Sequence, residues 1–326
     1  MNSEELKFKI FNITSFADFN DLALQIFHFQ YKQNAVYQKF VDLLPIAVDT
    51  ITSCYDIPCL PVEFFKSHEI RSVDTPVELV FKSSGTTSAQ RGKNLVFSQE
   101  LYEKSIAASF SSFVGNPEEC IVLALAPDYQ KEPQSSLAFM LDFLIKKSGH
   151  RESGFYLNNT AGLKEVLTAS PGKKKILFGI SWALLDFAEQ NPCNLTDTLV
   201  IETGGMKGRR KEITRYELHE VLKKNLGVAE VFSEYSMCEL MSQSYSTGRG
   251  LFKTPPWMKI YIREFNDPFA RAGNEKNGGI NIIDLANLYT CSFISTKDVG
   301  VMHADGTFEV HGRYDDSDIR GCSQMV

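Results

Sequence analysis

A hydroxyl-rich segment, FKSSGTTSAQRGK at residues 81–93, combines the residue types that bind a phosphate group. Five of its side chains carry rotatable hydroxyl groups, and these are Ser83, Ser84, Thr86, Thr87 and Ser88. Gly85 lies among them and allows close backbone approach, so that main-chain N–H groups can also face an anion. Arg91 and Lys93 add positive charge at the far end of the segment. This pattern predicts a phosphate-binding loop; a polar surface turn is the alternative, because turns use the same residues.

The spacing within this segment excludes the P-loop of many nucleotide-binding proteins. That motif has four residues between its first glycine and the Gly-Lys pair, and a serine or threonine follows the lysine. Here six residues separate Gly85 from Gly92, and Asn94 follows Lys93. If the segment binds a nucleotide, it does so in another structural context.

The elements around this segment predict an α/β sheet. Short apolar runs at 120–127, 174–181 and 197–205 are typical of buried parallel strands. They alternate with helical patterns at 98–114, 135–149 and 182–190, and ligands of such sheets bind at the strand ends.

The pattern of helical and strand-like stretches along the chain suggests a single domain with three parts. Residues 1–75 are mainly helical, residues 76–250 form the α/β nucleotide-binding part, and residues 251–326 form a smaller β-rich part with a tail. Residues 16–50 read as helical, and 203–227 reads as a strand end leading into a long helix of basic and acidic residues.

Two further stretches place polar or glycine residues at such strand ends. Gly204 and Gly205 follow one predicted strand, which fits either a backbone close to a flat ligand or a tight turn into a helix. Tyr235 and Glu239 follow another predicted strand within one short connection.

Composition limits the class of partner. The chain has 326 residues, of which 43% are hydrophobic and 23% charged, as expected of a globular protein. Its net charge of -6 argues against nucleic acid or an anionic membrane as partner, so a phosphate site here would be local. The N-terminus lacks a signal-peptide pattern, and seven scattered cysteines without zinc-type pairs fit a reducing compartment. We therefore expect a cytoplasmic protein.

Four separated segments resemble, in order, the motifs of the adenylate-forming enzymes, which include acyl-CoA synthetases, peptide-synthetase adenylation domains and firefly luciferase. Residues 81–93 resemble their phosphate loop, and EYSMCE at 234–239 resembles their Tyr-Gly-x-Thr-Glu element. STKDVG at 295–300 is similar to their Thr-Gly-Asp element, and GRYDDSDIRG at 312–321 to the Gly-Arg element before the hinge. Within this family the chain looks closest to the acyl-protein synthetase of the bacterial luminescence fatty acid reductase complex, through ETGGMKGRRKEITR, EYSMCELMSQSY and RGCS.

The resemblance implies a fold and a reaction. The fold would be that of an adenylate-forming N-terminal domain, with layered α/β sheets and a small β-rich subdomain, without the mobile C-terminal domain. The reaction would use ATP and Mg²⁺ to activate a carboxylic acid, expected to be a fatty acid, and transfer the acyl group to a protein cysteine. Because two anions must be brought together, such catalysis consists mainly of positioning and charge neutralisation.

The resemblance also assigns roles to individual residues. The residues that would hold the β- and γ-phosphates are Ser83, Ser84, Gly85, Thr86, Thr87 and Lys93. The residues around the nucleoside would be Gly204, Gly205 and Met206 beside adenine, Tyr235 stacked on it, Asp298 on both ribose hydroxyls and Arg313 near the ribose. Glu239 would bind Mg²⁺, a hard cation that prefers carboxylate oxygen.

Three positions depart from the family pattern. Ser236 stands in place of its glycine, Cys238 in place of its threonine, and Lys297 in place of the glycine before the ribose aspartate. Because a thiol is a weaker hydrogen-bond donor than a hydroxyl, Cys238 would weaken the contact to the α-phosphate. The departures leave open a catalytically weak scaffold subunit, and the expected lack of a C-terminal domain leaves open an acyl- or aryl-CoA ligase fragment completed by a partner. A hydrolase is disfavoured, because none of the six histidines lies in a nucleophile-elbow motif.

Cys322, in the terminal RGCSQMV, is the candidate acyl acceptor. Thiolate is a strong nucleophile toward an activated acyl group, and neighbouring Arg320 would favour ionisation. An incidental cysteine on a frayed tail is the alternative. A partner protein that accepts or reduces the acyl group is also expected from the resemblance.

Overall fold

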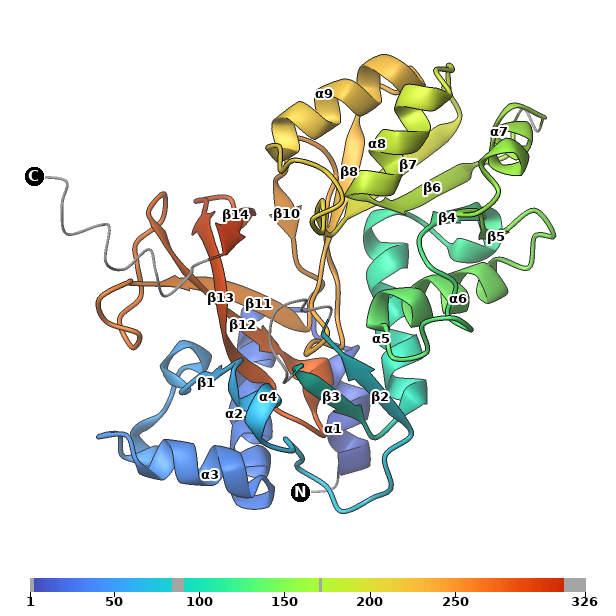
Figure 1. The fold of residues 1–326 in the computed structure, drawn as a ribbon. Helices are drawn as coiled ribbons and strands as arrows, with labels where there is room; N and C mark the ends of the chain where they lie inside the picture. Colours follow the sequence, from blue (N-terminus) through green and yellow to red (C-terminus); the bar gives the residue numbers. More distant parts are fainter. Residues whose placement is uncertain (1–2, 84–90, 170–171, 314–326) are drawn as a thin grey trace, which may run out of the picture.

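A single mixed sheet of twelve strands organises the protein in a computed structural model that describes residues 3–83, 91–169 and 172–313 (Figure 1). In sheet order its strands are β11 (Met258–Arg263), β12 (Asn277–Asp284), β13 (Phe293–Met302), β14 (Phe308–Arg313), β10 (Phe252–Lys253), β9 (Ser244–Ser246), β8 (Val231–Tyr235), β7 (Thr198–Thr203), β6 (Lys175–Ile180), β4 (Ile121–Leu125) and β5 (Gly154–Phe155), with β1 (Leu60–Pro61) paired to β13.

The strands β5, β4, β6, β7 and β8 run parallel. Every residue of β4 and β6 is buried, which confirms the prediction of buried parallel strands from short apolar runs. In Figure 1 helices α5 and α6 lie on one side of these strands, and α8 and α9 lie on the other. Because both faces of these strands are covered, most of their side chains are apolar.

The helices, in chain order, are α1 (Ser3–Ile10), α2 (Phe16–Gln33), α3 (Ala35–Asp42), α4 (Phe64–Ser67), α5 (Gln99–Phe113), α6 (Ser136–Ser148), α7 (Thr160–Ala169), α8 (Ser181–Gln190) and α9 (Arg215–Leu226). The helix expected at 98–114 is α5, and Ser98 caps it, since its hydroxyl accepts a hydrogen bond from the backbone N–H of Leu101. α6 ends where expected, at Gly149 in the left-handed conformation.

Two predicted helices are shorter than their sequence patterns. The helical region 16–50 is interrupted at Asn34, whose side chain caps α3 by accepting from Tyr37 N–H and also donates to the carbonyl of Thr290. The long helix expected after Gly205 begins only at Arg215, because Thr214 and Glu217 form a capping box there. Residues 204–214 form an irregular connection that carries the two glycines.

The hydroxyl-rich segment connects the two strands of a separate antiparallel hairpin. β2 (Leu79–Lys82) pairs with β3 (Lys93–Val96), with Phe81 opposite Asn94. Beyond the strands, Ser83 N–H donates to the Gly92 carbonyl and Gly92 N–H donates to the Ser83 hydroxyl. The hairpin therefore continues to the edge of the described residues on both sides of the segment.

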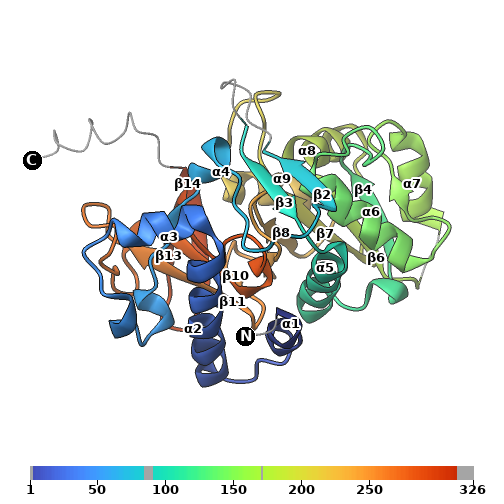
Figure 2. The same cartoon turned by 90° about the horizontal axis from the view of Figure 1, so that it is seen from below.

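The β-rich part predicted after residue 250 is continuous with the α/β part. β10 pairs with both β9 and β14, so the hydrogen-bonded sheet runs from one part into the other. The N-terminal helices pack on this β-rich part (Figure 2). There Phe293 of β13 contacts the rings of Phe27 and Tyr37. Among the residues described, no helix is both long enough and apolar enough to cross a membrane.

Candidate functional site

A tightly held turn after β8 carries Glu239. Asn94 of the β2–β3 hairpin donates from its side chain to the carbonyl of Cys238 at 2.9 Å, and Asn287 donates to the carbonyl of Glu239 at 2.8 Å. The buried Asp284 accepts hydrogen bonds from the backbone N–H groups of Met241 and Ser242, both at 2.9 Å. Three polar side chains distant in sequence thus fix the position of this turn.

The same turn lies against the hairpin that leads into the hydroxyl-rich segment. A Cβ atom at Gly92 would lie 2.6 Å from Oε1 of Glu239, closer than non-bonded atoms approach. It would lie 3.4 Å from the hydroxyl of Ser83. Glycine at position 92 therefore lets the Glu239 carboxylate approach the end of the predicted phosphate loop.

Glu239 is a buried carboxyl group with little nearby compensation. Burial raises its pKa, while its own backbone and the charges of Arg313 and Lys66 act in the opposite direction. Among the residues that the structure describes, the side-chain oxygens of Asn94 and Asn287, which flank the turn, are buried without a hydrogen-bond partner. A cation would stabilise the charged form of this buried carboxyl group, and carboxylate oxygen is what a hard cation prefers, so Glu239 fits Mg²⁺.

Cys238 precedes this carboxylate and stays a neutral thiol. Burial raises its pKa well above the usual value, and the charge of Glu239 adds to that effect. A thiol held in this form is not a nucleophile. Its position therefore supports no reactive role.

Three of the predicted nucleoside residues form one hydrogen-bonded chain. The Tyr235 hydroxyl donates to Oδ2 of Asp298 at 2.7 Å, and Arg313 Nε lies 3.1 Å from Oδ1 of the same carboxylate. Each carboxylate oxygen keeps one further acceptor site. The Tyr235 ring contacts Phe252 and Phe308 edge-on, which fixes the ring at the end of β8. The sequence predicted these three residues at one site but not the bond between Tyr235 and Asp298.

The connection after β7 gives different results for its two glycines. Gly204 has a φ of +71°, so the turn itself requires glycine there. Gly205 has no positive φ, and a Cβ atom there would meet only Oε2 of Glu212, at 3.9 Å. Backbone conformation therefore explains the glycine at 204 but not the one at 205. For Gly205 the interpretation that the backbone lies close to a ligand still stands. Met206 is 2% exposed, so its side chain is part of the core.

Lys93 and Lys297 have surroundings that the sequence did not indicate. Lys93 is exposed and alternates along β3 with the buried Asn94, so the two side chains lie on opposite faces of the strand. Lys297 forms an ion pair with Glu63 at 3.1 Å. The phosphate role of Lys93 remains a prediction.

Seven of the predicted residues lie outside the described ranges. They are Ser84, Gly85, Thr86, Thr87, Cys322 and the accessory Ser88 and Arg320. Their roles remain predictions from the sequence.

A buried polar network behind the site was not predicted. Arg215 Nε lies 3.1 Å from Glu202, and its Nη1 donates to the carbonyl of Val310 in β14. Ser181 donates to Glu202 at 3.0 Å, and His219 Nε2 lies 3.6 Å from it. The only sequence signal was a charged residue inside the apolar run 198–203. The network ties β7, α9 and β14 together at the end where the candidate residues gather.

A second unpredicted residue is Glu234, on the opposite face of β8 from Tyr235. Thr203 donates to its Oε2, and its Oε1 is buried with no hydrogen-bond partner in the described part of the chain. Burial raises the pKa of Glu234 to about 7. This group titrates in a range where ordinary carboxyl groups are fully ionised.

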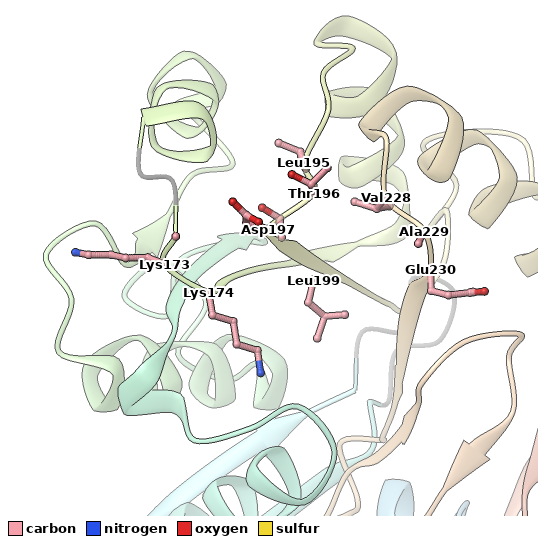
Figure 3. A pocket seen from close by; sticks show the side chains of 11 residues that line it. Lys173, Lys174, Leu195, Thr196, Asp197, Leu199, Val228, Ala229 and Glu230 are labelled. Carbon is pink, nitrogen blue, oxygen red and sulfur yellow. The ribbon is translucent and has the colours of Figure 1, made fainter.

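A pocket of about 490 Å³ lies at the other end of the same strands (Figure 3). Figure 3 shows charged side chains at its margin, which are Lys173, Lys174, Asp197 and Glu230. They precede β6, β7 and β8, whereas the candidate residues follow these strands. None of the candidate residues lines this pocket, so we assign it no catalytic part. Among the residues described, no group of three or more metal-binding side chains is present.

Comparison with known proteins identifies the fold. No family model and no curated protein matches the sequence. ATP-bound MatB from Rhodopseudomonas palustris aligns with a TM-score of 0.57 and 14% identity, covering 73% of this chain and 48% of that one. An open conformation of 2-hydroxyisobutyryl-CoA ligase, solved with 2-HIB-AMP and CoA, aligns with a TM-score of 0.66 and 11% identity, covering 93% and 72%. The long-chain-fatty-acid-CoA ligase FadD1 from Archaeoglobus fulgidus aligns with a TM-score of 0.55 and 15% identity, covering 76% of this chain and 54% of that one.

These similarities confirm the predicted α/β fold of adenylate-forming ligases. The chain spans about half the length of MatB, which was solved with ATP. Sequence identity is low in each of these alignments, so they establish the fold of this chain and not its activity.

Proposed function

We propose that this protein activates a carboxylic acid with ATP and transfers the acyl group to a protein thiol. The observation that carries the proposal is the approach of Glu239 to Gly92, beside the Tyr235–Asp298–Arg313 chain. The described end of the β2–β3 hairpin meets the Glu239 turn, and the nearby Asp298 carboxylate is suited to a ribose.

In the proposed first step, an oxygen of the acid attacks the α-phosphorus of ATP. The bond to the bridging oxygen breaks, pyrophosphate leaves and an acyl adenylate forms. The hydroxyl-rich segment would bind the β- and γ-phosphates through N–H and O–H donors. Asp298, held by Tyr235, would accept the ribose hydroxyls and orient the α-phosphorus.

Magnesium would neutralise phosphate charge when bound. Glu239 would be its protein ligand, in the turn that Asn94 and Asn287 hold in place. Burial of Glu239 supports this role, because a buried carboxylate gains most from a cation.

In the proposed second step a thiolate attacks the acyl carbon, AMP leaves and a thioester forms. Cys322 is the candidate thiol. A fatty acid is the expected substrate, by the sequence resemblance alone.

The test of the first step is carboxylate-dependent exchange of labelled pyrophosphate into ATP. A panel of fatty, aryl and short-chain acids should include at least one that supports exchange. If no acid does, and ATP still binds, the protein is a nucleotide-binding scaffold rather than a ligase.

The test of the second step uses the acid that gives the strongest exchange, in radiolabelled form. Wild type should acquire a hydroxylamine-labile label, whereas Cys322→Ser should keep exchange and lose the label. Cys193→Ser is the matched control and should retain both. A label that persists in Cys322→Ser would place the acceptor elsewhere.

A further inference from the structure

A second pocket, of about 630 Å³, lies between the segment after α3 and the β-rich part. Ser295 of β13 lines it, and none of the candidate site residues does. Figures 1 and 2 show the segment after α3, in blue, beside the orange β-rich strands. This volume lies within the usual range for small-molecule sites, roughly 300–1,000 Å³.

The walls of this pocket are apolar. Ile46, Ile51, Ile57 and Phe40 come from the N-terminal part, and Phe269 comes from the connection between β11 and β12. Phe269 is 56% exposed, although a phenyl ring at that position gains nothing from contact with water. An apolar ligand would cover this ring.

The floor carries neutral polar groups. Cys59 Sγ lies 3.2 Å from the Tyr261 hydroxyl, and burial raises the pKa of Cys59 to about 12, so the thiol stays protonated. Among the described residues the half-buried Ser295 hydroxyl has no hydrogen-bond partner. The floor can therefore hydrogen-bond a ligand but would not react with it.

A cation marks the rim. The Arg271 guanidinium lies 4.6 Å from the centre of the Tyr55 ring, which holds it beside the opening. Within the described ranges no carboxylate lies within 4 Å of it, and Asp56 at the same rim is outside that distance. An arginine that is positioned but has no acidic partner is suited to an incoming carboxylate.

We propose that this pocket binds a monocarboxylic acid with an apolar body, at a site separate from the catalytic one. The body lies between the isoleucine side chains and Phe269, and the carboxylate pairs with Arg271. No bond is made or broken. The inference does not depend on the proposed function, since it rests on the pocket alone.

The experiment is photolabelling of the full chain with a long-chain fatty acid that carries a diazirine near its methyl end. Label should appear, by peptide mass mapping, in residues 46–61 or 258–271, and unlabelled fatty acid should compete for it. Label found only in peptides containing residues 235–239, or no label at saturating probe, would overturn the inference.

Two variants sharpen the result. Arg271→Gln should raise the probe concentration for half-maximal labelling about tenfold, since a charged hydrogen bond to the carboxylate is lost. Phe269→Ala, at an exposed position where folding is not at risk, should raise that concentration severalfold, because apolar contact with the probe is lost. Arg151→Gln, another exposed arginine, is the control and should label as wild type. Equal labelling of all four proteins would refute the assignment.

Two readouts separate this inference from its competitors. Pyrophosphate exchange, where present, should be the same in Arg271→Gln and wild type, so that failure of the ligase proposal does not affect the result. Sedimentation tests a second copy as the occupant. If wild type self-associates and Phe269→Ala does not, the pocket is an interface between copies and the ligand proposal is wrong.

Discussion

The two ends of the parallel strands β6, β7 and β8 differ in how their polar side chains are held. At the carboxyl end, Tyr235, Asp298 and the Glu239 turn are fixed by hydrogen bonds from several elements. At the amino end lies the pocket of Figure 3, of about 490 Å³, but Asp197 and Glu230 at its margin are exposed to water. Volume alone therefore does not mark a site in this molecule.

The difference has an energetic origin. A buried charge held by fixed dipoles interacts with a ligand in a low local dielectric, whereas an exposed charge is screened by water. The carboxyl end has the first kind of group and the amino end the second. Paired substitutions at the two ends test this contrast.

The largest expected effect is on Glu239→Gln. It replaces the proposed magnesium ligand by a neutral group of the same shape, and pyrophosphate exchange should fall by about 10² or more. Glu230→Gln, at the amino end, should exchange as wild type does. Ordinary exchange by Glu239→Gln, with an unchanged circular dichroism spectrum, would remove Glu239 from the site.

The next effect concerns stability and pH. Burial raises the pKa of Glu234 from 4.5 to about 7, so the native state disfavours the ionised form. The free energy of unfolding should therefore fall as pH rises from 4.5 to 7, and this carboxyl group accounts for up to about 3 kcal/mol of the fall. Glu234→Gln should lack that part of the decline and be more stable than wild type at pH 8.

Urea unfolding at pH 5 and pH 8 measures this difference. Asp284, whose pKa burial raises to about 6, contributes its own decline to both proteins and cancels in the comparison. Asp197→Asn, at the amino end, should follow wild type at both pH values. Parallel curves for wild type and Glu234→Gln would contradict the assignment.

Tyr235→Phe should have a smaller effect. It removes the hydroxyl that donates to the buried Asp298, and the loss should be about 1–2 kcal/mol of unfolding free energy. Tyr216→Phe is the control, because Tyr216 is 74% exposed, and its stability should not change. Equal stability of the two variants would mean that water replaces the Tyr235 hydroxyl without loss.

The smallest effect is expected for Cys238→Thr. A hydroxyl is a better donor than the neutral thiol, so exchange should rise a few-fold or stay unchanged. Cys193→Thr, before β7 at the amino end, should leave exchange unchanged. Loss of activity in Cys238→Thr alone would give the thiol a role of its own.

Much of the fold was predictable because short stretches of sequence reflect how buried each strand is and where each helix begins or ends. The runs that became β4, β6 and β7 are apolar since both faces of those strands are covered, and Ser98 and Gly149 mark helix ends by their own chemistry. The break at Asn34 was missed, because its side chain bonds to Thr290, 256 residues away. No window of the sequence contains that contact.

The sequence by itself determined which residue types follow which strands, and thus that Tyr235, Glu239 and Gly204 stand at strand ends. The tertiary structure alone decided that Asn94 holds the Glu239 turn against Gly92, that Tyr235 binds Asp298, and that Glu234 is buried with a free oxygen. Strand ends are local properties, set by periodicity and turn residues. The pairing of polar groups between distant segments depends on sheet order and register, which only the folded chain establishes.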